Sequence, residues 1–138
     1  HSGFKTKCSL IELFKLKKIK YIDFGTYVNN DCDYHDFIYN QMLAYNNNEF
    51  NLGISICRSG QGVNLCANHL GFRSALIYDE WSMEMAIRHN NVNFIAFSER
   101  LIDNNIYHLE NIINIIFNNS FEGGRHLDRI GKVMKINV

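Results

Sequence analysis

The 138-residue chain contains no proline, and it carries no net charge because 14 basic side chains balance 14 acidic ones. A neutral chain offers no bulk electrostatic attraction to nucleic acid, so a nucleic-acid partner is not indicated. It has no apolar run long enough to cross a bilayer and no signal-peptide pattern, so we expect no membrane partner. Asparagine, isoleucine and lysine are abundant instead, a bias that we attribute to AT-rich coding sequence rather than to function.

Cysteine is sparse, and its spacing excludes the usual cysteine-based sites. The four residues, Cys8, Cys32, Cys57 and Cys66, show no metal-type spacing and not the density of a small secreted domain. We therefore expect reduced thiols in a cytoplasmic protein, with no metal site.

The remaining composition is that of a globular protein. Hydrophobic residues make up 46% of the chain and aromatic residues 13%, which favours a packed core over disorder. The length suits one domain. Because there is no internal repeat and no linker-like stretch, we expect residues 1–138 to form a single domain.

Helix and strand patterns alternate along the chain. Amphipathic spacing and capping signals predict helices over residues 4–17, 37–43, 61–70, 80–89 and 104–118, with a tail helix from Arg125. Short apolar runs predict four strands, over residues 21–24, 52–57, 74–77 and 93–97.

This alternation predicts an α/β fold: a Rossmann-like, three-layer α/β/α domain with a parallel sheet. A doubly wound domain normally opens with a strand before its first helix, whereas this pattern opens with a helix. We therefore expect a first strand upstream of His1.

The strongest local signal for chemistry follows the strand at 52–57. Cys57 ends an apolar run and leads into Arg58-Ser59-Gly60-Gln61-Gly62, which opens a helix. The amide donors and dipole of a helix N-terminus favour negative charge, so a thiol there can act as a base or nucleophile. The alternative is that Cys57 is a small buried apolar residue. The loop lacks the Walker and dinucleotide-binding patterns.

A second anion-binding signal lies in the tail. Gly123-Gly124 allows a sharp bend, and Arg125 and Arg129 then stand four residues apart on one helix face. Paired guanidinium groups suit phosphate or carboxylate. Together with the Cys57 loop, the tail predicts a pocket for a small phosphorylated molecule.

Three further residues have both a functional and a structural interpretation. His89, at a helix end, is either a catalytic group or a partner of the helix dipole. Tyr34 is either a wall beside a ligand or a core aromatic residue. Arg100, after a strand, is either an anion ligand or a solvated charge. Trp81 and the other three cysteines are interpreted as ordinary structural residues.

Seven segments then match one family in order, from the first residue to the tail. They are residues 1–4 (HSGF), 22–27 (IDFGTY), 33–37 (DYHDF), 53–68 (GISICRSGQGVNLCAN), 71–76 (GFRSAL), 88–93 (RHNNVN) and 121–129 (FEGGRHLDR). In these segments the chain resembles the ribose-5-phosphate isomerase B family, which includes the galactose-6-phosphate isomerase subunits.

The resemblance implies an enzyme that interconverts ribose 5-phosphate and ribulose 5-phosphate in the non-oxidative pentose phosphate pathway. It implies a cytoplasmic homodimer, or a dimer of such dimers, with active sites at the subunit interface and with no metal or organic cofactor. The implied residue roles are Cys57 as base, Ser59 and the Gly60–Val63 amides (with Gly62 among them) as oxyanion donors, His89 for ring opening with Asn90 beside it, Tyr34 beside the sugar, and His1, Arg100, Arg125 and Arg129 as phosphate ligands.

Several positions depart from the family pattern. An aspartate usually precedes the position of His1, Arg58 replaces a glycine, and His35 replaces a proline. Glu99 stands before Arg100, and Asp128 replaces a basic tail residue.

These departures keep two alternatives open beside the pentose isomerase: a hexose-phosphate isomerase subunit, and a sugar-phosphate-binding dimer that has lost catalysis. A receiver-type signalling domain is a weaker option, because Asp23 and Asp79 do not form a convincing acidic cluster.

Overall fold

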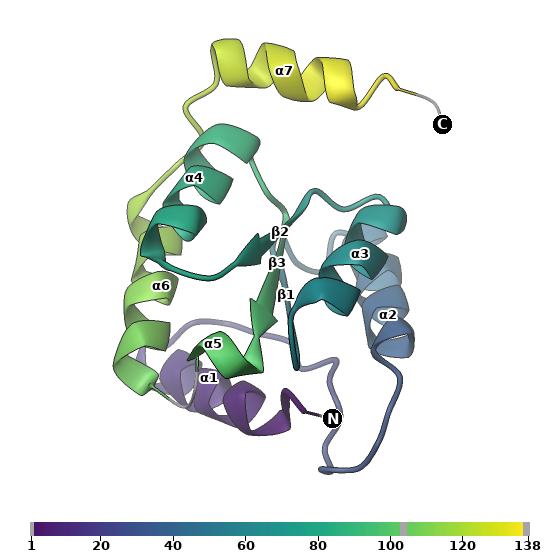
Figure 1. The fold of residues 1–138 in the computed structure, drawn as a ribbon, viewed down its shortest axis with the longest axis vertical. Coiled ribbons are helices and arrows are strands. Elements are labelled where there is room, and N and C mark those ends of the chain that lie inside the picture. Colours follow the sequence, from purple (N-terminus) through teal and green to yellow (C-terminus); the bar gives the residue numbers. More distant parts are fainter. Residues whose placement is uncertain (1, 103–104, 137–138) are drawn as a thin grey trace.

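A parallel sheet of three strands forms the centre of the structure, a computed structural model that describes residues 2–102 and 105–136 (Figure 1). The elements in chain order are α1 (Phe4–Leu16), α2 (Tyr34–Asn46), β1 (Gly53–Cys57), α3 (Gln61–His69), β2 (Ser74–Ile77), α4 (Glu80–Asn90), β3 (Phe94–Ser98), α5 (Glu99–Ile102), α6 (Ile106–Asn118) and α7 (Arg125–Val133).

The strand β3 lies in the middle of the sheet, in the order β1-β3-β2, with both pairings parallel. All five of its residues are buried. Successive side chains point to opposite faces, so Ile95 and Phe97 enter one hydrophobic cluster while Phe94 and Ala96 enter the other. A strand buried on both faces explains why this segment reads as a continuous apolar run.

Helices cover both faces of the sheet. On one face, α1, α4 and α6 contribute the apolar residues Leu10, Leu13, Met83, Ala86, Leu109, Ile112 and Ile113. On the other face, α2 and α3 contribute Ile38, Val63 and Ala67. Figure 1 shows the same two groups of helices on either side of the strands. The predicted three-layer α/β/α fold is therefore confirmed.

Side-chain caps fix where several helices begin. The Asp33 carboxylate accepts a hydrogen bond from the His35 amide at the start of α2, and Asp79 and Ser82 form a capping box at the start of α4. Asn105 accepts from the His108 amide at the start of α6. Among the helices in the described part of the chain, none combines the length and the apolar character that a membrane crossing needs.

The strand predicted over residues 21–24 is wrong. These residues are not in the sheet, and Tyr21 and Ile22 are exposed. Asp23 instead ties the segment to α1, because the Lys7 ammonium donates to its carboxylate at 2.7 Å. The physical reason is the lack of a neighbouring strand: among the described residues a cavity separates this segment from β1. A strand cannot form without a partner for its backbone groups.

Candidate functional site

The loop after β1 holds the cysteine that the sequence singled out. Cys57 is the last residue of β1 and is partly buried, and the Gly60 amide donates a hydrogen bond to its Sγ atom at 3.2 Å. Gly60 is also the N-cap of α3, so the sulfur lies at the positive end of a helix. Further along that first turn, the amides of Gly62 and Val63 have no partner within the helix. The loop can therefore stabilise a negative charge next to a thiol.

Only glycine fits at position 60. Its φ of +75° lies in the left-handed region. A Cβ atom there would lie 2.3 Å from Leu76 Cδ1, 3.0 Å from the Phe97 carbonyl carbon and 3.1 Å from the Ser98 nitrogen. The turn is thus pressed against the sheet, which fixes the place of Cys57.

The same loop is tied to β3 by a second contact. The Ser98 hydroxyl donates to the Arg58 carbonyl oxygen at 2.9 Å. This bond uses the backbone of Arg58, while the residue itself is exposed. The arginine that replaces the family's glycine therefore does not lie buried against Cys57.

Two other predicted residues lie at this carboxyl edge of the sheet. Tyr34 begins α2 and faces the start of α3, since a Cβ atom on Gly62 would lie 2.8 to 3.0 Å from its phenol group. Arg100 lies two residues beyond β3, in α5, and is exposed. His1 lies outside the described residues.

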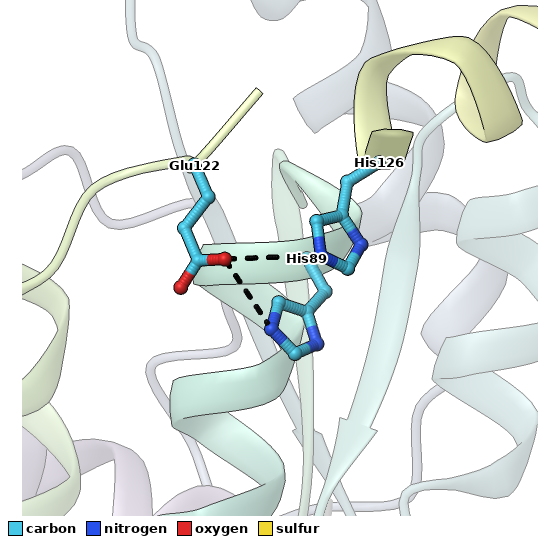
Figure 2. A group of neighbouring side chains, drawn as sticks. All are labelled: His89, Glu122 and His126. Atoms are coloured by element: carbon cyan, nitrogen blue, oxygen red, sulfur yellow. Dashed lines mark ion pairs between the residues drawn. The ribbon is translucent and has the colours of Figure 1, made fainter. Parts of the chain in front are cut away.

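A second group of polar side chains forms where α4 meets the tail (Figure 2). The rings of His89 and His126 are stacked, with centroids 4.0 Å apart and an interplanar angle of 7°. The Nε2 atom of each lies 3.7 Å from the same carboxylate oxygen, Oε2 of Glu122. The Glu122 amide also donates to the Arg88 carbonyl oxygen at 3.0 Å, so backbone and side chains together join the tail to α4.

Neighbouring charges set the protonation of this group. The Arg88 guanidinium donates to the Glu122 carboxylate at 2.7 Å and holds the pKa of that carboxyl below its usual range. Burial lowers the pKa of His126, and the positive charges of His89 and Arg125 lower it further. At neutral pH we therefore expect an ionised Glu122 beside a neutral His126, which can exchange a proton with its surroundings.

This group is also the one among the described residues whose donor atoms could hold a metal ion, since the ligand atoms of His89, Glu122 and His126 lie within 4.8 Å of one another. Two features argue against that use. The imidazole rings lie parallel rather than converging on one point, and the cations Arg88 and Arg125 lie beside the cluster. Such surroundings suit an anionic ligand better than a cation.

The Cys57 loop lies at the opposite end of the sheet from His89, Glu122 and His126, which we call the histidine cluster. Cys57 ends β1 at the carboxyl edge of the sheet, whereas α4 follows β2 and returns to the amino end of β3. Since an α-helix rises about 1.5 Å per residue, its 11 residues carry His89 roughly 15 Å from the edge where it begins. Figure 1 shows α7 beside this far end of α4, and α5 at the other end of the sheet.

The structure thus brings the predicted site residues together in two sets. Cys57, Ser59, Gly60, Gly62, Tyr34 and Arg100 lie at the carboxyl edge, and His89, Asn90, Arg125 and Arg129 lie at or next to the histidine cluster. Among the residues that the structure describes in one chain, no pocket joins the tail to the Cys57 loop. Sequence reasoning missed Glu122 and His126 as partners of His89. These two residues stand on either side of Gly123-Gly124, and their spacing became informative only when the structure showed that the tail turns back onto α4.

Known proteins share the family and the fold of this chain. A family model described as Ribose/Galactose Isomerase matches residues 1–133. Ribose-5-phosphate isomerase B of Escherichia coli is 28% identical over 137 residues, which cover 99% of this chain and 91% of that protein.

Two solved structures are similar throughout the chain. Ribose-5-phosphate isomerase B of Thermotoga maritima has a TM-score of 0.92 and 31% identity, and the match covers 99% of this chain and 93% of that one. The Mycoplasma genitalium enzyme, solved with bound ribulose 5-phosphate, has a TM-score of 0.86 and 32% identity, with coverage of 98% and 90%. The chain belongs to the ribose/galactose isomerase family.

Proposed function

We propose that this protein is an aldose–ketose isomerase that interconverts ribose 5-phosphate and ribulose 5-phosphate in the cytoplasm. The observation that carries the proposal is the Cys57 loop, in which a sulfur atom and unpaired helix amides face the same edge of the sheet. The bound ribulose 5-phosphate of the Mycoplasma genitalium relative supports the choice of substrate.

In the proposed reaction the Cys57 thiolate removes the proton from C2 of the open-chain aldose. The electron pair moves to C1 and onto the former carbonyl oxygen, which gives an enediolate. The Cys57 thiol then delivers its proton to C1, and a proton passes from the C2 oxygen to the C1 oxygen to give the ketose. Ser59 and the first-turn amides of α3 stabilise the oxyanion, because they point at it before the charge develops.

The ring form of the sugar must open before this step, and His89 is the proposed acid or base for ring opening. The stacked His126 and the Glu122 carboxylate hold its ring in place. Arg125 and Arg129, with Arg100 and His1, are the proposed phosphate ligands. Phosphate binding holds the reacting carbons over Cys57, which raises the effective concentration of the base.

We propose a homodimer because the two sets of site residues cannot meet within one chain. A two-fold interface places the same surfaces against each other in reverse, so the Cys57 loop of one protomer can meet the histidine cluster of its partner. The helix α7 and its C-cap, Met134, carry apolar side chains that such a partner would cover: Leu127, Val133 and Met134 are 57%, 63% and 57% exposed.

Mixing two inactive variants tests this arrangement. Cys57→Ala damages the loop and His89→Gln damages the cluster. If each site takes one set from each protomer, a mixed dimer contains one intact site, so an equimolar, re-equilibrated mixture recovers about a quarter of the wild-type activity. The control is a mixture of His89→Gln with Arg125→Ala, which damage the same set and give no recovery. Sedimentation velocity measures the dimer itself.

The substrate is tested separately with the unaltered protein. We expect turnover of ribose 5-phosphate to exceed that of six-carbon aldose 6-phosphates by at least about tenfold in kcat/KM. If the unaltered protein turns over ribose 5-phosphate but the mixture of Cys57→Ala and His89→Gln recovers no activity, the shared site is refuted and the isomerase activity still stands. Absence of turnover with a folded dimer would refute the isomerase.

A further inference from the structure

Arg58, the residue that follows Cys57, carries a positive charge that no acidic side chain neutralises. The residue is exposed. In the part of the chain that the structure describes, its guanidinium forms no ion pair, whereas Arg88 pairs with both Glu84 and Glu122. The charge of Arg58 therefore stays available to a ligand.

The backbone of Arg58 is held in place, although its side chain is not. The Ser98 hydroxyl donates to the Arg58 carbonyl oxygen at 2.9 Å. Two residues further on, Gly60 is pressed against the backbone of Phe97 and Ser98. Among the described residues this carbonyl bond is the contact that engages Arg58, and the guanidinium has no hydrogen-bond partner of its own. The charge can therefore move about a fixed point next to Cys57, but it cannot leave the loop.

The carboxylates near this loop do not offset that charge. Arg58 and Cys57 line the same cavity, which extends along β1, and two acidic residues of the described chain line it as well. Asp23 is already paired with the Lys7 ammonium at 2.7 Å. Glu49 precedes β1 and so lies toward the amino end of the strand, whereas Cys57 ends it. The uncompensated charge beside Cys57 is therefore positive.

The proposed function determines which part of a ligand meets this charge, and the inference rests on it. If Cys57 removes a proton from C2 of an open-chain sugar phosphate, C1 and its oxygen lie at the Cys57 loop, beside the first-turn amides of α3. The proposed ligands Arg125 and Arg129 hold the phosphate at the other end of the sugar. We propose that Arg58 binds negative charge at the C1 end of the sugar phosphate. Aldonic acid 5-phosphates, which carry a carboxylate at C1, are therefore ligands and inhibitors of this protein.

A guanidinium group suits the C1 end for two reasons. Its planar fork of N–H donors matches a carboxylate in a bidentate arrangement. During isomerisation the same group meets the enediolate, in which negative charge develops on the C1 oxygen. The aldehyde carries no full charge at that oxygen, so the interaction is stronger in the transition state than with the bound substrate. Arg58 therefore raises kcat more than it lowers KM.

Isothermal titration calorimetry with two ligands tests the proposal. Ribonate 5-phosphate and ribitol 5-phosphate share the phosphate and the hydroxyl groups from C2 to C4. They differ at C1, which is a carboxylate in the first and a neutral hydroxymethyl group in the second. The ratio of their two dissociation constants measures the preference for charge at C1. We expect this preference to fall by about fivefold or more in Arg58→Gln, whereas Arg58→Lys, which keeps the charge, keeps most of it.

Lys18→Gln is the matched control. It removes the same charge at an exposed position that does not line the cavity. The ratio should stay at the wild-type value in this variant, which separates a local contact from an effect of net charge. The Arg58 variants should fold, because the hydrogen bond from Ser98 uses the carbonyl oxygen of residue 58 and not its side chain.

The possible outcomes separate this inference from the proposed function. A ratio that falls in Arg58→Gln and not in Lys18→Gln supports the inference. If Arg58 binds the phosphate instead, Arg58→Gln weakens both ligands equally and leaves the ratio unchanged, which overturns the inference while the isomerase still stands. An equal fall in the Lys18→Gln control overturns it too. If neither ligand binds the unaltered protein, the sugar-phosphate site is refuted and the inference fails with it.

Discussion

Replacing Gly60 with alanine tests whether the turn after Cys57 is fixed by close packing. Two costs follow from the structure. The left-handed backbone, with φ of +75°, costs an alanine about 1–2 kcal/mol. The new methyl group would also lie 2.3 Å from Leu76 Cδ1 and 3.0 Å from the Phe97 backbone, and forcing extra volume into a packed site costs about 1–3 kcal/mol more.

Gly71 provides a matched control because it has the backbone problem without the crowding. Its φ is +90°, and no other side chain or backbone atom lies within 4 Å of the place that an alanine methyl group would occupy. Gly71→Ala should therefore lose only about 1–2 kcal/mol, whereas Gly60→Ala should lose about 2–5 kcal/mol. Against a typical stability of about 5–15 kcal/mol, both variants should still fold in the cold.

Urea unfolding followed by circular dichroism measures the two free energies of unfolding. Catalysis provides a second readout, since displacement of the turn moves the Gly60 amide away from Cys57. We expect Gly60→Ala to lose turnover of ribose 5-phosphate and Gly71→Ala to keep it. Equal free energies of unfolding for the two variants would refute the claim that the turn is pressed against the sheet.

Two further predictions concern titratable groups. Because the folded chain lowers the pKa of His126 below the ordinary 6.5, the unfolded chain binds that proton more readily, so stability falls as pH drops through 6.5. The melting temperature should fall more between pH 7.5 and 5.5 in the wild type than in His126→Asn; an equal fall in both contradicts this. Burial, with the charge of Asp33, raises the pKa of the Cys66 thiol, so iodoacetamide should label Cys66 more slowly than the exposed Cys8 at pH 7.5. Mass spectrometry of labelled peptides measures both rates, and faster labelling of Cys66 would be the contrary result.

Much of the fold could be predicted from local patterns. Amphipathic spacing and caps located the described helices other than the short α5. The fully apolar run at β3 agreed with a strand covered on both faces. The Cys57 loop was also predictable, since a glycine turn between a strand and a helix is a local feature. By contrast, the strand expected over residues 21–24 depended on a partner for its backbone, and pairing is a tertiary property that no local pattern reports.

The candidate site was only half predictable. The direction of α4 follows from its place between two parallel strands, so the distance of His89 from Cys57 was implicit in the predicted topology. The contact of His89 with His126 was not implicit, because it depends on how the Gly123-Gly124 turn folds the tail against α4. Both glycines have positive φ values, +69° and +52°. The sequence shows that the backbone can bend at these two glycines, but it does not show in which direction the tail then runs.

The most direct test of the proposed function is the turnover of ribose 5-phosphate by the wild type, Cys57→Ala and Cys66→Ala, with binding of the sugar phosphate measured in parallel. We expect the wild type and Cys66→Ala to convert the sugar, whereas Cys57→Ala binds it and does not convert it. The reason is that the Cys57 sulfur, at the end of β1, accepts from the N-cap amide of α3, while Cys66 lies within that helix. Turnover by Cys57→Ala at the wild-type rate would contradict the assignment of this thiol as the base.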